Sequence, residues 1–158
     1  VFNRSSFGKE PIADLNIKSS VLSPCEVASG DVPNLIDELP ILFIASCFAE
    51  GTSSFIDIEE LKHKESDRLK AMQDGLDKMK IKNFLDGNVF CIEGMGKDYK
   101  SPNFLAETYY DHRIAMSFAI AGLNSNSSIE IASPECINTS FPEFIELGKK
   151  LGCNFEIS

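Results

Sequence analysis

The sequence lacks an excess of positive charge and has no long apolar run. It contains 158 residues, with 15 Lys and Arg against 24 Asp and Glu, so the net charge is −9. An acidic chain repels phosphate backbones, and we therefore expect no nucleic-acid partner. The longest apolar run, 41–49, is interrupted by Ser46 and is far shorter than the roughly 20 residues of a membrane-spanning helix. We therefore expect no membrane partner.

Closely spaced metal ligands are also missing. The five cysteines include no C-x-x-C pair, their number is odd, and only His63 and His112 could supply imidazole. This pattern predicts reduced thiols in a cytoplasmic protein and no bound metal. No basic-then-apolar leader is present at the start, and a first residue of valine predicts a piece of a longer protein.

What the sequence does contain is typical of a globular domain. Hydrophobic residues make up 43% and charged residues 25%, which argues against disorder. Two segments are apolar on almost every helical face. The first is a predicted helix with Asp37 as its N-cap, Pro40 in its first turn, a largely apolar run from 41 to 50 and Gly51 at its end. The second covers 112–123. Helices of this kind are expected to be buried on all sides.

The remaining pattern predicts a repeated unit, because the order buried helix, strand, amphipathic helix, strand occurs twice. We expect helices in the middle and sheets outside. The other predicted elements are strands at 13–21, 52–58, 128–131 and 154–157, a hairpin of 81–85 with 89–92 joined by the turn 86–88, and amphipathic helices at 66–79 and 140–151. Residues 1–11 are predicted to be a strand end plus a loop, and 23–34 and 97–108 to be loops.

The densest charged segment is 62–70, KHKESDRLK, at the predicted start of an amphipathic helix. A helix N-terminus attracts anions, and Lys64 and Arg68 are four residues apart, so both could reach one ligand. Glu65 between them could transfer a proton. The alternative is a solvated helix start with ion pairs inside the helix.

Three further polar sites precede predicted helices. Asp111, His112 and Arg113 lead into a buried helix, where unpaired charges would be costly, so they are either functional or a capping Asp–Arg pair. Asp37 is either a proton acceptor or a plain N-cap. The segment 139–142, TSFP, suits an ordinary helix start capped by Ser140.

Taken together in their order, these segments resemble the C-terminal half of the EPSP synthase (3-phosphoshikimate 1-carboxyvinyltransferase) family. The resemblance spans essentially the whole chain, and its most specific parts are KESDR and DHRIAM. The matching segments are NR at 3–4, GKEPIAD at 8–14, IDELP at 36–40, FAEGT at 48–52, KESDRL at 64–69, DHRIAM at 111–116 and SFP at 140–142.

The resemblance implies an α+β fold, the enolpyruvate transferase-type alpha-beta prism. Members of the family have two similar domains, each built from three β-α-β-α-β-β units with helices inside and sheets outside. Residues 1–158 would then form about one and a half to two units of the C-terminal domain. The N-terminal domain would be absent from this chain and would be its partner.

The resemblance also implies an activity. The family transfers the enolpyruvyl group of phosphoenolpyruvate to the 5-hydroxyl of shikimate 3-phosphate, on the way to chorismate and the aromatic amino acids. The reaction is an addition followed by an elimination, and no cofactor is implied. The isolated piece is expected to bind without turnover, because the family's active site lies between two domains.

The family's motifs assign roles to residues of this sequence. Asp37 would contact shikimate 3-phosphate and accept a proton, Glu65 would shuttle the proton of the methylene carbon, and Lys64 would lie where both substrates meet. Arg68 and Arg113 would hold phosphoenolpyruvate. Asp111 and His112 would position Arg113. One position departs from the pattern, because Thr139 stands where many members carry a lysine, which puts one phosphoenolpyruvate contact in doubt.

Two other functions are left open by the sequence. The sister enzyme that transfers enolpyruvyl to UDP-N-acetylglucosamine shares the architecture, although KESDR and DHRIAM are not expected in it. A non-catalytic binding module is the second alternative, and it has no motif of its own here.

Overall fold

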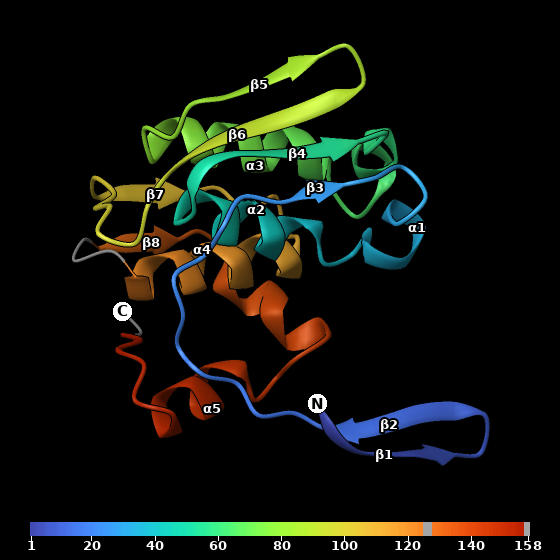
Figure 1. The fold of residues 1–158 in the computed structure, drawn as a ribbon. Helices are drawn as coiled ribbons and strands as arrows, with labels where there is room; N and C mark the ends of the chain where they lie inside the picture. Colours follow the sequence, from blue (N-terminus) through green and yellow to red (C-terminus); the bar gives the residue numbers. More distant parts are fainter. Residues whose placement is uncertain (125–127, 157–158) are drawn as a thin grey trace.

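A four-stranded sheet packs over helix α2 (Leu39–Cys47) in the computed structural model, which describes residues 1–124 and 128–156 (Figure 1). Its strand order is β3-β4-β6-β5, with β3 parallel to β4 and the other neighbours antiparallel. The hairpin predicted around Asp86-Gly87-Asn88 is confirmed as β5–β6. The strands are β3 (Glu26–Val27), β4 (Glu50–Ile56), β5 (Asn83–Asp86) and β6 (Val89–Met95).

The first apolar helix is confirmed as α2 (Leu39–Cys47), and it lies beneath this sheet. The Phe43 ring packs edge-on against Phe55 of β4 and Phe90 of β6, with centroid separations of 4.7 and 5.0 Å. All three rings are fully buried. Burial of three aromatic side chains makes this contact a large part of the hydrophobic core.

The second apolar helix is α4 (His112–Asn124), and its burial is less complete than the sequence predicts. Ile114 and Phe118 are fully buried, whereas Ile120 is 36% exposed and Leu123 is 40% exposed. Helix α4 packs against α2, α3 (Arg68–Lys78) and the 3-10 helix η2 (Pro134–Thr139). These neighbours cover its start better than its C-terminal turns, so the expectation of burial on all sides is wrong for those turns.

Gly75 brings α3 close to α4. A Cβ atom at this position would lie 1.9 Å from Cζ of Phe118, which no side chain could tolerate without a shift of the helices. The absent side chain therefore sets the spacing of the two helices, and their first residues meet at one end of the structure. Arg68, the first residue of α3, contacts Asp111 beside the first residue of α4 at that end.

Short elements complete the same body. Strand β7 (Phe104–Ala106) pairs in parallel with β8 (Ile129–Ile131). The strand predicted at 128–131 is therefore confirmed as β8, whereas the prediction of a loop throughout 97–108 is wrong. The 3-10 helix η1 (Glu59–His63) follows β4. The segment 23–34 includes β3 and the short helix α1 (Val32–Leu35), and it was predicted to be a loop only.

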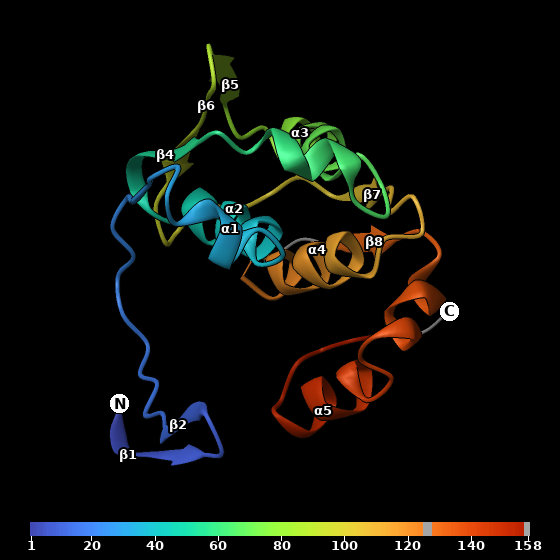
Figure 2. The same ribbon diagram turned by 90° about the vertical axis from the view of Figure 1, so that its right-hand side faces the viewer.

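Both ends of the chain differ from the prediction. Strands β1 (Phe2–Phe7) and β2 (Glu10–Asp14) form an antiparallel hairpin that stands apart from the helices in both views (Figures 1 and 2). The strand predicted at 13–21 is wrong, because β2 ends at Asp14 and the next residues have no partner strand; Ile17 is 87% exposed.

At the other end, helix α5 (Phe144–Lys150) begins later than predicted. Pro142 disfavours helical backbone in the residue before it, and Ser140 is the C-cap of η2 instead of the N-cap of α5. Residues 154–156 form no strand, and Ile157, the last residue of the strand predicted there, lies outside the described residues.

Candidate functional site

Arg68 is the centre of a charge network at the ends of three helices. It is the first residue of α3 and is fully buried. Its Nε donates to Oδ2 of Asp111 at 2.8 Å, its Nη1 to Oδ1 of Asp37 at 2.8 Å, and its Nη2 to Oε2 of Glu65. All three nitrogen atoms of the guanidinium therefore have a carboxylate partner, as a buried cation requires.

Asp111 joins this network to α4 and is also fully buried. Its Oδ2 accepts from the Ser66 hydroxyl at 3.1 Å in addition to Arg68, and its Oδ1 accepts from the backbone N–H of Arg113 at 2.9 Å. Asp111 therefore caps the start of α4 and fixes Arg68 at the same time. It contacts Arg113 through the main chain, and the Arg113 guanidinium has other partners.

The turn before Asp111 is strained. Tyr109 and Tyr110 have φ angles of 52° and 60°, in the left-handed region that costs non-glycine residues about 1–2 kcal/mol each. The buried Thr108 holds this turn, because its hydroxyl donates to the Ala132 carbonyl at 2.9 Å and its carbonyl accepts from the Asp111 N–H at 2.9 Å. Strain of this kind persists where the surrounding structure fixes a side chain, and here that side chain is Asp111.

Arg113 lies closer to the surface than Arg68, on the other side of Asp37. Its Nη1 donates to the main-chain carbonyl of Asp37 at 2.7 Å and to Oε1 of Glu38 at 2.9 Å, and its Nη2 is 3.8 Å from Oδ2 of Asp37. Its side chain is 28% exposed, compared with 1% for Arg68. Glu38, and not Asp37, is the N-cap residue of α2, so the plain N-cap interpretation of Asp37 is wrong.

Neighbouring positive charges keep the Asp37 carboxyl ionised. Partial burial alone would raise the pKa of its carboxyl, but the hydrogen bond from Arg68 and the charges of Arg113, Arg68 and Lys64 hold that pKa below the usual 3.8. For Arg68, burial alone would lower the pKa, and the hydrogen bond and charge of Asp111, with Asp37 and Glu65, raise it instead. At neutral pH the network is therefore ionised at both residues.

Lys64 and Glu65 both precede α3, which begins two residues later than the predicted helix start at Ser66. Lys64 is the C-cap residue of η1, and its Nζ donates to Oε1 of Glu60 at 2.7 Å. The helix begins at Arg68, and its start is capped by Asp67, whose carboxylate accepts from the Lys70 N–H at 2.9 Å. The helical i,i+4 spacing therefore does not apply to Lys64 and Arg68, and their reach to one ligand stays a prediction. The charge of Lys64 still acts on Asp37, where it helps to lower the pKa.

His112 and Thr139 complete the set of predicted positions. His112 is the first residue of α4 and is half-buried beside Asp111. Thr139 is the last residue of η2, where its hydroxyl donates to the Cys136 carbonyl at 2.7 Å. Sequence reasoning missed two residues of the network, Glu38 and Ser66. In the sequence, the one indication of a role is that each directly follows a predicted site residue, Asp37 or Glu65.

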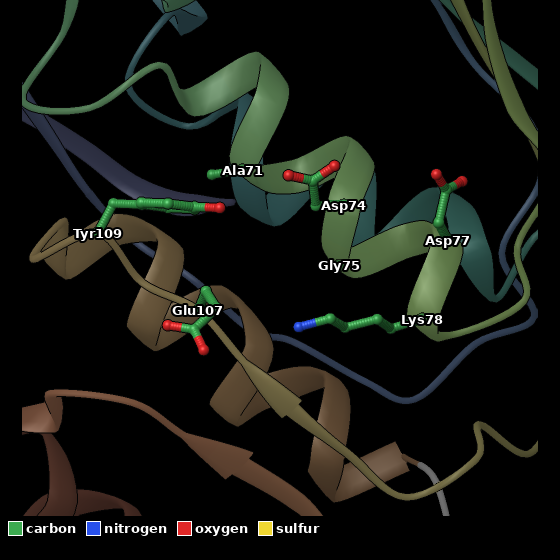
Figure 3. Close-up of a pocket in the computed structure, with 7 residues that line it drawn as sticks. All are labelled: Ala71, Asp74, Gly75, Asp77, Lys78, Glu107 and Tyr109. Carbon is green, nitrogen blue, oxygen red and sulfur yellow. The ribbon is translucent and has the colours of Figure 1, made fainter.

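Two adjoining grooves run along α3 beside this network. One, of about 340 Å³, is shown in Figure 3 and lies between α3 and the segment around Glu107 and Tyr109. The other, of about 320 Å³, is lined by Glu65, Ser66 and Asp67 as well as Tyr109, so it opens beside the Glu65 carboxylate. Solvent and small ligands therefore have access to that side of the network.

Two classes of feature are absent from the part of the chain that the structure describes. Over residues 1–124 and 128–156, no group of three or more His, Cys, Asp and Glu side chains could hold a metal ion. No helix within those same ranges has the length and apolar character needed to cross a membrane.

The chain is similar in sequence and structure to EPSP synthases. A family described as EPSP synthase (3-phosphoshikimate 1-carboxyvinyltransferase) matches residues 6–147. The 3-phosphoshikimate 1-carboxyvinyltransferases of Petrotoga mobilis and Zymomonas mobilis are 42% and 43% identical over 96% and 98% of this chain. An EPSP synthase structure from Acinetobacter baumannii matches 99% of the chain with a TM-score of 0.91 at 42% identity.

A more distant structure defines the fold class. The enolpyruvyl transferase NikO from Streptomyces tendae matches 84% of this chain and 28% of its own, with a TM-score of 0.59 at 18% identity, so the two share a fold. The predicted α+β, enolpyruvate transferase-type fold is thereby confirmed. Within it, the chain belongs to the EPSP synthase family. It spans about a third of the length of its relatives, 34% and 35% of the two enzymes and 36% of the Acinetobacter chain.

Proposed function

We propose that residues 1–158 form part of the C-terminal domain of an EPSP synthase, about one and a half to two β-α-β-α-β-β units. The missing N-terminal domain would lie in the segment that precedes this region in the relatives, and we call this chain joined to that segment the full-length enzyme. Support comes from the family match and from the coverage of about a third of each relative. We further propose a cytoplasmic location.

The proposed reaction joins phosphoenolpyruvate to shikimate 3-phosphate. The 5-hydroxyl oxygen bonds to C2 of phosphoenolpyruvate as its methylene carbon takes up a proton, which gives a tetrahedral intermediate. Loss of a proton from the resulting methyl group and of phosphate from C2 then gives 5-enolpyruvylshikimate 3-phosphate. This chemistry needs a proton acceptor, a proton donor and cations for anionic substrates.

One observation carries the proposal: residues from three distant segments meet in a single network. Asp37 lies 31 residues from Arg68 in the sequence, and Asp111 lies 43 residues from it, yet both contact its guanidinium. Arg113 lies beside them and is partly exposed. A site that combines arginines with carboxylates fits a reaction between anions that also moves protons.

The roles of the two arginines follow from their contacts. We assign Arg113 and Arg68 to phosphoenolpyruvate and Lys64 to shikimate 3-phosphate. Arg68 has a carboxylate on every nitrogen, so an anion could reach it only by replacing one of them. Asp111 is fully buried, and Asp37, whose side chain is 49% exposed, is also held by Arg113. The side chain of Glu65 is 55% exposed and pairs with Arg68, so it is the partner we expect to be replaced. Asp111 would stay in place and position Arg68, and together with His112 it would fix the start of α4 and hence Arg113.

The two proton-transfer roles fall to Asp37 and Glu65. The arginines keep the pKa of Asp37 low, so its carboxylate is ionised and able to accept the proton of the 5-hydroxyl. Glu65, once released from Arg68, would carry the proton to and from the methylene carbon. Glu65→Gln in the full-length enzyme should slow turnover by about 10²–10⁴-fold, measured as kcat. A wild-type kcat would contradict this role.

The proposal is tested by phosphate release from phosphoenolpyruvate and shikimate 3-phosphate. We expect release by the full-length enzyme and none by residues 1–158 alone, which would bind without turnover. Release by residues 1–158 alone would refute the shared site. If UDP-N-acetylglucosamine replaced shikimate 3-phosphate as the acceptor, the sister reaction would be the function instead.

A further inference from the structure

Glu38 contacts the one guanidinium of the site that reaches the surface. Its Oε1 accepts from Nη1 of Arg113 at 2.9 Å, and the same Nη1 donates to the Asp37 carbonyl at 2.7 Å. The two residues are 75 positions apart in the sequence, and the pair links the start of α2 to the start of α4.

Hydrogen bonds hold the main chain of both Glu38 and Arg113 in place. The backbone N–H of Glu38 donates to the Leu35 carbonyl at 2.8 Å, and its own carbonyl accepts from the Leu42 N–H at 3.1 Å. The backbone N–H of Arg113 donates to the buried carboxylate of Asp111 at 2.9 Å. The remaining freedom of the Arg113 guanidinium therefore lies in its side chain, and Glu38 with the Asp37 carbonyl restrains its tip.

The contacts leave one edge of this guanidinium for a ligand. Within residues 1–124 and 128–156, the side-chain hydrogen bonds of Arg113 all come from Nη1. Nη2 is 3.8 Å from Asp37 Oδ2, which is beyond hydrogen-bond distance. Nε and Nη2 lie side by side on a planar group, and such an edge binds a carboxylate or phosphate with two parallel hydrogen bonds.

We propose that Glu38 is a positioning residue: it holds Nη1 of Arg113 so that the Nε–Nη2 edge faces the carboxylate or phosphate of phosphoenolpyruvate. The inference rests on the proposed function for the identity of the anion. It does not rest on that function for the restraint, which is a property of the protein alone. Without Glu38, the Asp37 carbonyl is the one hydrogen-bond acceptor left for this guanidinium among the described residues, and the longer ion pair with Asp37 Oδ2 restrains its rotation less.

Steady-state kinetics of the full-length enzyme test the consequence for the substrate. Glu38→Ala should raise KM for phosphoenolpyruvate about five- to tenfold, because Arg113 is then no longer held in the orientation that makes its bidentate contact with the substrate. Glu38→Gln keeps an acceptor oxygen and should raise it only about twofold. KM for shikimate 3-phosphate, kcat and the melting temperature should stay near wild type. An unchanged or lower KM for phosphoenolpyruvate in Glu38→Ala, or an equal rise for both substrates, would overturn the proposal.

Arginine side-chain NMR separates this proposal from the function on which it rests. In the wild-type enzyme without substrate, rotation of the Arg113 guanidinium should be slow, and in Glu38→Ala it should be fast. The matched control is Glu146→Ala, which breaks an exposed ion pair with Lys150 on α5 and should change neither rotation nor KM. Slow rotation in Glu38→Ala refutes the positioning role. Fast rotation in an enzyme that releases no phosphate upholds it and refutes the proposed function.

Discussion

The two arginines of the site differ in what holds them. Arg68 is buried, and carboxylates from three segments occupy its three nitrogen atoms. Arg113 is partly exposed, and its hydrogen bonds run from one nitrogen to the start of α2. The same side chain can therefore serve mainly the structure in one place and mainly a ligand in the other. The burial of Arg68 itself and of its partner Asp111 accounts for the difference.

The largest expected effect comes from removing Asp111, the buried partner of Arg68. Asp111→Ala leaves the fully buried Arg68 Nε without its carboxylate, and we expect a loss of about 3–5 kcal/mol in the free energy of unfolding. Urea denaturation of the full-length enzyme measures it. The companion variant Arg113→Ala should lose less than about 1 kcal/mol, because its ion pairs are partly solvated. Equal losses would break the distinction between the two arginines.

Arg113 should matter more for ligand binding than for stability. Arg113→Ala should weaken phosphoenolpyruvate binding by about 1.5–3 kcal/mol, the value of hydrogen bonds to a charged group, and should affect shikimate 3-phosphate much less. Arg113→Lys should not restore the affinity, because an ammonium lacks the planar pair of donors. Calorimetric titration of each substrate gives both values. An equal loss for the two substrates would remove Arg113 from its assigned role.

The smallest expected effect is a pH dependence at Asp37, which touches both arginines. Because its pKa in the folded state lies below the usual 3.8, its ionised form stabilises the protein above that pH. This stabilisation is lost as the pH falls through 3.8 and then through the lower folded-state pKa. Its size should stay below about 1 kcal/mol, since the carboxyl is half-exposed.

Asp37→Asn should therefore differ most from wild type in unfolding free energy near neutral pH, and the difference should shrink in acid. Denaturation midpoints measured from pH 7 down to strong acid, in matched salt, follow that difference. A gap that widens as the pH falls would show that the arginines do not stabilise the ionised form of Asp37.

The sequence pattern predicted the elements whose conformation depends on neighbouring residues in the chain. The all-apolar segment of α2 and the Asp-Gly-Asn turn of the β5–β6 hairpin need no knowledge of distant residues. The strand expected at 13–21 was wrong because alternation describes a half-buried face without showing that a neighbouring strand exists. Residues such as Ile17 are exposed here for that reason.

The partners within the site could not be predicted in the same way. Motif resemblance singled out Asp37, Glu65, Arg68 and Arg113, but the pairing of Arg113 with Glu38 spans 75 positions in the sequence. It depends on how α2 and α4 pack, and on the spacing that Gly75 permits between α3 and α4. The contact of Asp111 with Arg68 was not predicted either: its carboxylate binds Arg68 directly, and it contacts Arg113 through the main chain.

The most direct test of the account is a structure of the full-length enzyme with phosphoenolpyruvate and shikimate 3-phosphate bound. The account predicts phosphoenolpyruvate on Arg113, Arg68 still bonded to Asp111 through Nε, and Glu65 displaced from Nη2. If Arg68 instead left Asp111 to reach the anion while Glu65 stayed in place, or if the anion bound away from Arg113, the division of roles between the two arginines would be contradicted.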